Sequence, residues 1–537
     1  MRRYHGAAFA AALATCACST ALAQDKSTIV IAIPGTPQGI DIDRQSGPQT
    51  WTIGMQVLEL GAEWATVDYP FGSEGVGDPR KIPGFKYPDF TGQKMDSGII
   101  ESCKLSEDGL SATYHLRPNV RSAAGNEFTA DDVIYRVERA IANNAITQFI
   151  QNSVNAGKRE QWSVVDKYTV AISAQTPMPQ ICTVLTNPYF YWLDSVEAKK
   201  HATSDDPWSN AWVSTGSMSY GPYHVVSWDA GRRIELVANP NYWRGEPEIK
   251  RVIYQVVPES ANRVALLAQG KVQLAEGLSP DEIVSLAGVS SVRVAAVRGN
   301  QSLYAIMNNA IAPFDKPEVR QAINMVLPRE AVAEQIYRGM AEPFYGVIPS
   351  LYPGYVDFRA EKGSLKQAMD LLAKADLAEG FDTQIAYSAG DPVQENVAIL
   401  MQTALRQIGI RVNLQKMPVA AHSDLVQSKK APFALWLDFP IQPDPNYALG
   451  LIYGTSNAVN YQNYSNAAVD DDIAKGVPIV SPAERAAAHE TPQRQIHNDA
   501  ALGWIVEPYF LTGMASSVEG WRWYPTQYYR VNDLSLK

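Results

Sequence analysis

The sequence has few cysteines, few histidines and little charge for its length. Of 537 residues, four are cysteine, seven are histidine, and only 19% are charged. It contains no G-x-S-x-G, H-E-x-x-H or G-x-x-x-x-G-K-[ST] signature, and no Cys and His spacing suited to zinc. We therefore expect no enzyme activity, no cofactor and no metal site. A secreted hydrolase of the glycosidase kind stays open as the alternative, because its chemistry needs only two carboxylates.

The sequence also lacks an excess of basic residues. Its 46 Lys and Arg are outnumbered by 56 Asp and Glu, so the net charge is −10, and it becomes −12 once Arg2 and Arg3 leave with the leader described below. A chain of this sign repels a phosphate backbone. The composition therefore argues against a nucleic-acid partner.

Long apolar runs are missing after the N-terminal leader. Arg2 and Arg3 precede a small, apolar run over residues 6–14, and Ala21-Leu22-Ala23 offers a small-x-small cleavage site. The run is shorter than the roughly 20 residues that a membrane-spanning helix needs. Residues 1–23 are therefore predicted to be a cleaved signal peptide of Gram-negative type, which places the mature protein in the periplasm.

The four cysteines divide between this leader and the mature chain. Cys16 and Cys18 fit a lipid-attachment pattern poorly, so lipoprotein anchoring is the less favoured alternative to periplasmic release. Cys103 and Cys182 remain in an oxidising compartment, where they can pair. Their spacing does not decide between a disulfide and two buried thiols.

Residues 221–245 form the most informative segment of the chain. Runs of β-branched and aromatic residues over 223–228 and 234–238 flank Asp229-Ala230-Gly231, whose residue types favour a tight turn. Pro240 ends the second run because it has no N–H for a strand ladder. The segment therefore predicts a β-hairpin.

Two further blocks carry equally clear local signals. Residues 107–117 predict a second hairpin around an Asp-Gly turn, and Thr129 with Asp132 predicts a capping-box start for a helix that runs toward Ala142. Residues 317–326 predict a helix with one apolar face.

The C-terminal half alternates helices with strands. Residues 365–375 and 392–407 predict amphipathic helices, and residues 409–414 predict a strand after the second of them. Such alternation favours an α/β fold.

The three blocks, in this order across residues 98–345, resemble the dipeptide/oligopeptide class of periplasmic solute-binding proteins of ABC importers (solute-binding protein family 5, cluster C). The resemblance implies an α/β, two-lobed periplasmic-binding-protein fold of type II, with mixed sheets flanked by helices and a hinge between the lobes. It places lobe I, with an extra subdomain, at residues 24–300 completed by 506–537, and lobe II at 301–505.

The resemblance also implies a role. We expect an extracytoplasmic substrate-binding component that captures a peptide or peptide-like small molecule between its lobes and delivers it to an inner-membrane ABC permease complex. Periplasmic binding proteins are a standard example of hinge closure around a ligand. A monomer is expected. Opine-type conjugates of sugars and amino acids, and oligosaccharides, are the alternative ligands in the same role.

Residues 435–447 hold the main candidate site. Apolar residues lead to Asp438 and three prolines follow it, so its carboxylate lies where a strand opens into an irregular loop. The resemblance assigns Asp438 to the α-ammonium of a peptide ligand, with Trp436 and Phe439 beside it as further ligand-binding candidates, although this loop is longer than the family pattern. Capping of a turn is the alternative role for Asp438.

Three further residues are assigned to the cleft by the resemblance. Gln49 and Trp51 fall where family members present groups to the ligand from the other lobe, and Tyr461 begins a Tyr-Gln-Asn-Tyr-Ser-Asn segment like one near the family's cleft. The alternative for Trp51 is a ring that anchors the core. No arginine is assigned to a ligand carboxylate.

Overall fold

The computed structural model describes residues 26–537 apart from 46–47, 73–74, 90–93, 217–218, 390 and 526–527. The predicted signal peptide over residues 1–23, with Cys16 and Cys18, lies outside the described residues. Within the described part, none of the helices combines the length and the apolar character needed to cross a membrane.

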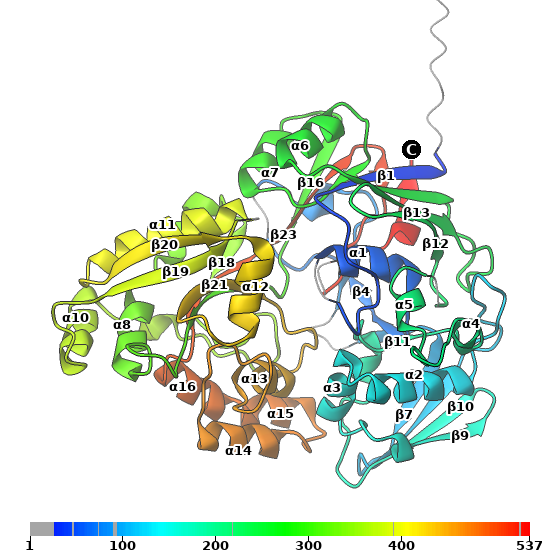
Figure 1. Ribbon diagram of the computed structural model, residues 1–537, viewed down its shortest axis with the longest axis horizontal. Helices are drawn as coiled ribbons and strands as arrows, with labels where there is room; N and C mark the ends of the chain where they lie inside the picture. The colour runs from blue at the N-terminus through cyan, green and yellow to red at the C-terminus, as the bar shows by residue number, and fades with distance from the viewer. Residues whose placement is uncertain are drawn as a thin grey trace, which may run out of the picture.

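One half of the molecule is built on a mixed sheet of seven strands (Figure 1). The strands are β1 (Thr28–Ile33), β12 (Tyr223–Asp229), β13 (Arg233–Ala238), β14 (Arg251–Val256), β15 (Leu274–Ala275), β16 (Val292–Val297) and β23 (Phe510–Ala515). Their order is β12-β13-β14-β1-β15-β23-β16. The inner strand β1 pairs parallel with both of its neighbours, and the other pairs are antiparallel.

The other half is built on a mixed sheet of six strands. These are β17 (Ser302–Met307), β18 (Ala341–Pro343), β19 (Asp382–Ser388), β20 (Arg411–Met417), β21 (Phe433–Asp438) and β22 (Gly503–Pro508). Their order is β18-β22-β17-β21-β19-β20. β19 pairs parallel with β20 and β21, while β17 pairs antiparallel with β21 and β22. β21, which carries the candidate site, is therefore an inner strand.

A smaller antiparallel sheet lies in the first half. Its strands are β7 (Ile100–Leu105), β8 (Ser111–Leu116), β9 (Trp162–Asp166) and β10 (Thr169–Ser173), in the order β7-β8-β10-β9. The helices α2 (Ala130–Ala142) and α3 (Ile146–Ser153) accompany it, and they face the six-stranded half at the bottom of the view (Figure 1).

The remaining helices flank the sheets. They are α1 (Pro48–Val57), α4 (Ser195–Lys200), α5 (Asn210–Val213), α6 (Ser260–Ala268), α7 (Pro280–Leu286), α8 (Pro317–Val326), α9 (Arg329–Ala331), α10 (Leu365–Lys374), α11 (Pro392–Arg406), α12 (Val419–Gln427), α13 (Pro445–Tyr453), α14 (Ala467–Gly476), α15 (Pro482–Ala488) and α16 (Glu490–Asn498). Short strands pair in twos: β2 (Glu59–Leu60) with β11 (Tyr191–Trp192), β3 (Ala62–Trp64) with β6 (Met95–Ser97), β4 (Thr66–Val67) with β5 (Tyr87–Pro88), and β24 (Val518–Glu519) with β25 (Ser535–Leu536).

The chain crosses between the two large sheets twice. It passes from β16 to β17 through residues 298–301 and returns from β22 to β23 through Tyr509. The six-stranded half is therefore inserted within the seven-stranded half. β22 spans residue 506, where the resemblance placed the return to lobe I, and it pairs within the six-stranded sheet as far as Pro508.

Both predicted hairpins form. β12 and β13 pair at the edge of the seven-stranded sheet, and Gly231 in their turn has a φ of 76°, a left-handed value that glycine adopts without strain. β7 and β8 pair around Gly109, whose φ is 71°. The turn residues seen in the sequence thus fix both connections.

The predicted helices form as well. The backbone N–H of Thr129 donates to the Asp132 carboxylate at 2.8 Å at the start of α2. α8 has the predicted bounds, and α10 and α11 each end one residue earlier than predicted. The strand predicted over 409–414 is β20, which begins later because Gly409 takes a left-handed φ of 82° in the preceding turn.

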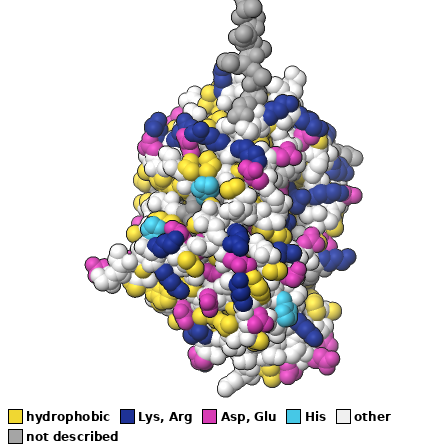
Figure 2. Space-filling view, turned by 90° about the vertical axis from the view of Figure 1, so that its right-hand side faces the viewer, with side chains coloured by type: hydrophobic (Ala, Val, Ile, Leu, Met, Phe, Trp, Pro, Cys, Tyr) yellow, Lys and Arg dark blue, Asp and Glu magenta, His cyan; other side chains and the backbone are white. Residues whose placement is uncertain are grey.

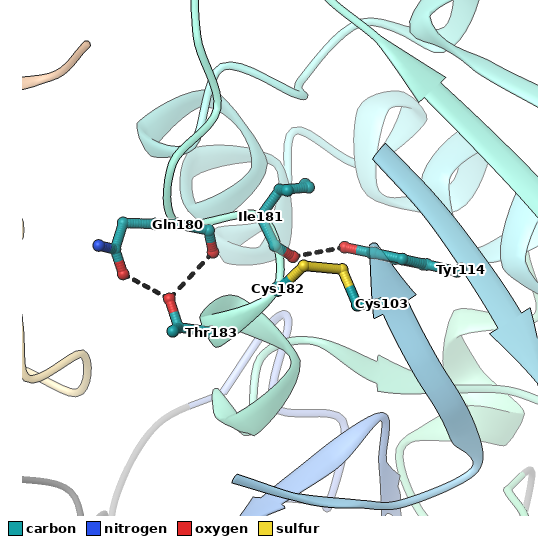
Figure 3. Close-up of a disulfide and its surroundings, with 6 residues drawn as sticks. All are labelled: Cys103, Tyr114, Gln180, Ile181, Cys182 and Thr183. Atoms are coloured by element: carbon teal, nitrogen blue, oxygen red, sulfur yellow. Dashed lines mark hydrogen bonds between the residues drawn. A yellow bond between two sulfur atoms is a disulfide. The ribbon is translucent and has the colours of Figure 1, made fainter. Parts of the chain in front are cut away.

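Cys103 and Cys182 form a disulfide, which settles the choice that their spacing left open. The bond joins β7 to a segment that is 79 residues away in sequence, beside the buried ring of Tyr114 (Figure 3). The Tyr114 hydroxyl donates to the carbonyl of Ile181 at 2.7 Å. The disulfide and this hydrogen bond together hold the segment around Cys182 against the small sheet.

A buried ion cluster joins α2 to the loop between β1 and α1. The Arg136 guanidinium lies 2.7 Å from Asp43, and the Arg139 guanidinium lies 2.9 Å from Asp43 and 2.6 Å from Asp41. None of the four side chains is more than 2% exposed. Thr147 on α3 also donates to Asp43. The cluster therefore connects the loop that precedes α1 to helices α2 and α3.

The charges of this cluster compensate one another. Burial opposes ionisation of Asp43, but the Arg136 and Arg139 guanidinium groups outweigh it and hold the pKa of Asp43 below its ordinary value of 3.8. A group with a lowered pKa stabilises the fold above its unfolded pKa, and that stability is lost as the pH falls through the folded pKa. The contribution of Asp43 is therefore present at neutral pH and lost in strong acid.

The molecular surface carries charges of both signs. On the face in Figure 2, which is the right-hand side of Figure 1, Lys and Arg side chains are interspersed with Asp and Glu. This face shows no large area of a single sign.

The ion cluster gives a testable expectation for stability. Arg139→Met leaves Asp41 and Asp43 buried with only one guanidinium, so we expect the free energy of unfolding to fall by about 3–5 kcal/mol. The matched control is Arg411→Met, which removes an exposed ion pair with Asp382 and should cost less than about 1 kcal/mol. Urea unfolding of both variants at pH 7 measures the difference, and equal losses would contradict the role given to the cluster.

Candidate functional site

Asp438 stands at the carboxyl end of β21, where the sheet gives way to a loop. In the ladder with β17, Asp438 lies opposite Ser302. The chain then runs through Phe439 and Pro440 to Asp444, which caps α13 by accepting the backbone N–H of Tyr447 at 2.9 Å. Asp444 therefore caps α13, and the Asp438 side chain lies at the end of β21 without a role in that cap.

The Asp438 carboxylate has donors but no cation. The backbone N–H of Phe439 donates to Oδ1 at 2.8 Å, and the indole N–H of Trp436 approaches Oδ2 at 3.4 Å. Among the residues that the structure describes, no Lys, Arg or His forms an ion pair with it. Burial raises the pKa of Asp438, and the two donors only partly offset this effect. The site therefore holds a half-buried carboxylate whose charge is not balanced by a cationic side chain within the described residues.

Four tyrosines surround this carboxylate. Burial raises the pKa of the hydroxyls of Tyr304, Tyr447 and Tyr461, and the charge of Asp438 adds to the rise. Burial also raises the pKa of the Tyr189 hydroxyl, and the electrostatic effects of Tyr447 and Asp438 add to the rise. All four hydroxyls therefore stay neutral at physiological pH and present hydrogen-bonding groups around one negative charge.

The tyrosines come from both halves of the molecule. Tyr304 lies on β17, Tyr447 on α13, and Tyr461 packs edge-on against Trp436 with ring centroids 5.5 Å apart. Tyr189 instead belongs to the seven-stranded half, next to β11. Asp438 therefore lies near the junction of the two halves, close enough to Tyr189 for its charge to raise the pKa of that hydroxyl.

Two polar atoms near Asp438 have no hydrogen-bond partner within the described residues. They are the hydroxyl oxygens of Ser302 and Tyr304, on residues that are 1% and 4% exposed. Buried polar groups in native proteins are normally paired with protein or with water. Their position beside an uncompensated carboxylate is what a site for a polar, positively charged group requires.

Gln49 and Trp51, the residues predicted from the opposite lobe, make no direct contact with Asp438 within the described residues. Trp51 on α1 is 4% exposed and packs edge-on against Tyr189, with ring centroids 4.7 Å apart. It thus anchors the core, and it borders the site only through Tyr189. Gln49 is half-buried in the first turn of α1, and no contact joins it to Asp438 within the described part of the chain. Phe439 is half-buried, and its backbone N–H binds Asp438.

The backbone of Tyr189 is fixed by the buried ion cluster. Its carbonyl accepts a hydrogen bond from Arg136 at 3.3 Å and lies 2.6 Å from the Thr147 hydroxyl, whose single proton can be donated either to this carbonyl or to Asp43. The same two side chains bind Asp43. The cluster therefore positions the tyrosine that faces Asp438.

A cavity of about 220 Å³ lies next to this site. It lies between α3 and the segment after Pro179 on one side, and α13 and α14 on the other. Tyr447 lines it, and the charge of Asp438 raises the pKa of the hydroxyl of the same residue. No cluster of three or more potential metal ligands occurs in the residues that the structure describes.

The sequence analysis named Asp438 as a candidate but did not name most of the residues around it. Tyr447 ends the segment already singled out, but Tyr189 and Tyr304 carry no local signal, since they reach Asp438 only through the packing of three separate chain segments. Tyrosines are common in this chain, with 26 in total, so composition could not single them out.

Comparison with known proteins places these features in a family. The family described as "Bacterial extracellular solute-binding proteins, family 5 Middle" matches residues 94–460. A curated relative, the "Probable D,D-dipeptide-binding periplasmic protein DdpA" of Escherichia coli K12, is 23% identical over 520 residues, which cover 95% of this chain and 94% of that protein.

Solved structures share the fold across nearly the whole chain. The periplasmic binding protein DppA from Helicobacter pylori, in complex with the peptide STSA, has a TM-score of 0.80 at 20% identity and covers 95% of this chain and 98% of its own. The dipeptide binding protein from Pseudoalteromonas sp. SM9913, in complex with Met-Leu, has a TM-score of 0.81 at 19% identity and covers 95% and 100%. The chain belongs to the bacterial extracellular solute-binding proteins of family 5.

Proposed function

We propose that this protein is the periplasmic substrate-binding component of an ABC importer, and that it captures short peptides or peptide-like molecules by their α-ammonium group. The observation that carries the proposal is Asp438, a half-buried carboxylate that has no cationic partner among the described residues and lies near the junction of the two halves. The relatives named above are periplasmic binding proteins for D,D-dipeptides and peptides, which supports the same role here.

We propose that the two halves, each built on one of the large sheets, are the lobes that close around the ligand. Lobe II carries Asp438 with Tyr304, Tyr447 and Tyr461, and lobe I presents Tyr189. A ligand stabilises the closed arrangement only to the extent that it binds that arrangement better than the open one. An ammonium group satisfies this condition if it neutralises the half-buried Asp438 carboxylate better in the closed arrangement than in the open one.

The permease and the monomeric state belong to the same proposal. A protein that delivers its ligand in the periplasm needs the signal peptide predicted over residues 1–23 and a membrane partner that accepts the closed form. Two lobes within one chain build the proposed site, since Tyr189 and Asp438 both come from it. A monomer therefore suffices for binding.

Two alternatives find less support in the geometry. An oligosaccharide site uses exposed aromatic faces, but Trp51 is 4% exposed and Trp436 is half-buried between Tyr461 and His422. A glycosidase needs a second carboxylate near the first, yet no carboxylate within the described residues perturbs the pKa of Asp438. An amino-acid conjugate of the opine type also carries an amine that Asp438 can bind. Binding measurements with a panel that contains both conjugates and peptides distinguish the two ligand classes.

The first test removes the charge of Asp438 while keeping its shape. Asp438→Asn should weaken the binding of peptides such as Ala-Ala and Ala-Ala-Ala at least about 30-fold, because loss of one partner of a buried charge pair costs about 2–5 kcal/mol. Asp370→Asn, on the exposed surface of α10, is the matched control and should bind as the wild type does. Isothermal titration calorimetry gives the affinities.

The same variant separates binding from stability. Because burial raises the pKa of Asp438, its ionised form destabilises the unliganded fold at neutral pH. Asp438→Asn should therefore leave the melting temperature of the unliganded protein unchanged or raise it. A variant that lost both affinity and stability would show Asp438 to be structural, and unchanged affinity would remove it from the site.

The second test is the pH dependence of binding. Protonation neutralises Asp438, so the affinity for an ammonium-bearing peptide should fall as the pH falls through the raised pKa of the unliganded site, by up to tenfold per pH unit below it. The range from pH 4 to 7 avoids deprotonation of the ligand. Asp438→Asn should show a flatter profile than the wild type, and identical pH profiles of the two proteins would contradict the ion-pair account.

A further inference from the structure

A buried asparagine lies in the first crossing between the two lobes. Asn300 belongs to residues 298–301, which join β16 to β17, and it is 1% exposed. Its Nδ2 group donates to the carbonyl of Pro440 at 2.9 Å and to the hydroxyl oxygen of Tyr352 at 3.1 Å. An amide nitrogen carries two hydrogens, so one of them is available for each acceptor. The crossing is thus bonded directly to the loop that follows Asp438.

Tyr352 completes a ring of three hydrogen bonds around the same carbonyl. Its hydroxyl donates to the carbonyl oxygen of Pro440, and the residue is 3% exposed. Burial raises the pKa of Tyr352, so its hydroxyl keeps the proton that it donates. A backbone carbonyl oxygen has two lone pairs. Here Asn300 and Tyr352 together supply a donor for each of them.

The loop after Asp438 needs such contacts from outside. Pro440 and Pro443 have no N–H, so neither can donate a hydrogen bond to a neighbouring backbone group. Pro440 directly follows Phe439, whose backbone N–H donates to the Asp438 carboxylate at 2.8 Å. The hydrogen bonds at the Pro440 carbonyl therefore restrict the position of this N–H and of the carboxylate that it binds.

Lobe I fixes the crossing just before the asparagine. The backbone N–H of Arg298 donates to the Tyr69 hydroxyl at 3.0 Å, and the Arg298 carbonyl accepts the Tyr87 hydroxyl at 2.9 Å. Gly299 lies so close to Trp523 that a Cβ at this position would be 2.7 Å from an atom of the ring. The backbone that leads to residue 300 is therefore held by lobe I on both sides.

The crossing has a second, separate contact with lobe II. The Arg298 guanidinium donates to the Ser350 hydroxyl at 3.1 Å, and the backbone N–H of Ser350 donates to Glu507 on β22 at 2.7 Å. This contact does not involve the loop after Asp438. Loss of the Asn300 side chain would therefore release that loop and leave the crossing attached to lobe II.

We propose that Asn300 is a positioning residue for ligand binding. It holds the loop after Asp438 on the part of the crossing that lobe I fixes, and so it sets where the Asp438 carboxylate lies relative to lobe I. The inference rests on the proposed function, because it takes Asp438 as the anchor of the ligand. Asn300 acts through the Pro440 carbonyl and need not touch the ligand. A binding group must be held within about 0.5 Å of its productive position, so release of the loop weakens binding.

The test compares two buried asparagines at opposite ends of β17. Asn300→Ala should weaken the binding of Ala-Ala-Ala, measured by isothermal titration calorimetry at pH 7, at least about fivefold. The matched control is Asn308→Ala. Asn308 is 0% exposed and donates to the carbonyl of Lys429 at 2.9 Å, away from Asp438. Both variants should lower the melting temperature, but Asn308→Ala should bind within about twofold of the wild type.

A double variant shows whether Asn300 acts through Asp438. If it does, Asn300→Ala has little left to disturb once the charge of Asp438 is gone. The double variant Asn300→Ala/Asp438→Asn should therefore bind within about threefold of Asp438→Asn alone. A residue that only supports the fold would weaken binding by the same factor in both backgrounds.

The outcomes separate this inference from the proposed function. Wild-type affinity in Asn300→Ala, an equal loss in Asn308→Ala, or losses that multiply in the double variant would each overturn the inference, while the peptide-binding function survives. Wild-type affinity in Asp438→Asn would overturn both. If Asn300→Ala does not fold, Tyr352→Phe decides, because it removes only the hydroxyl that binds Pro440. It should weaken binding at least about threefold, and unchanged affinity would overturn the inference.

Discussion

An unpaired carboxylate between two lobes is the constraint on which the rest of this structure depends. Asp438 is held by the N–H groups of Phe439 and Trp436, but it has no cation among the described residues, and burial raises its pKa. Such a group is costly in the unliganded protein. A ligand that brings a positive charge removes that cost. The relief of this unfavourable free energy contributes to the affinity for the ligand.

The other features of the molecule hold partners around that carboxylate. The ion cluster of Asp43 and Arg136 fixes the backbone of Tyr189, which is the lobe I residue that faces Asp438. The disulfide anchors the segment just before it. These contacts hold lobe I together around Tyr189, on the side proposed to meet the ligand. The two crossings between the sheets, at residues 298–301 and at Tyr509, leave the lobes joined by short connections that suit hinge motion.

The sequence was sufficient for the elements with strong local signals. The turn around Gly231, the cap at Thr129 and the apolar face of 317–326 each act within a few residues, so they predict their hairpin or helix closely. The change from strand to loop located the Asp438 carboxylate, but its ammonium-binding role was implied by the family resemblance and stays a proposal. Tyr189 and the pairing of Arg139 with Asp41 depend on segments that are distant in sequence, and no local pattern encodes them. Trp51 was assigned to the cleft by resemblance, yet its ring is buried against Tyr189.

The central claim is that the ligand's ammonium group neutralises Asp438. The most direct measurement compares the wild-type affinity for Ala-Ala-Ala with that for the same peptide acetylated at its N-terminus, by calorimetry at pH 7. Acetylation removes the positive charge and leaves the rest of the peptide intact. The account predicts that binding of the acetylated peptide is lost or weakened by at least about 30-fold. Equal affinity for the two peptides would contradict it.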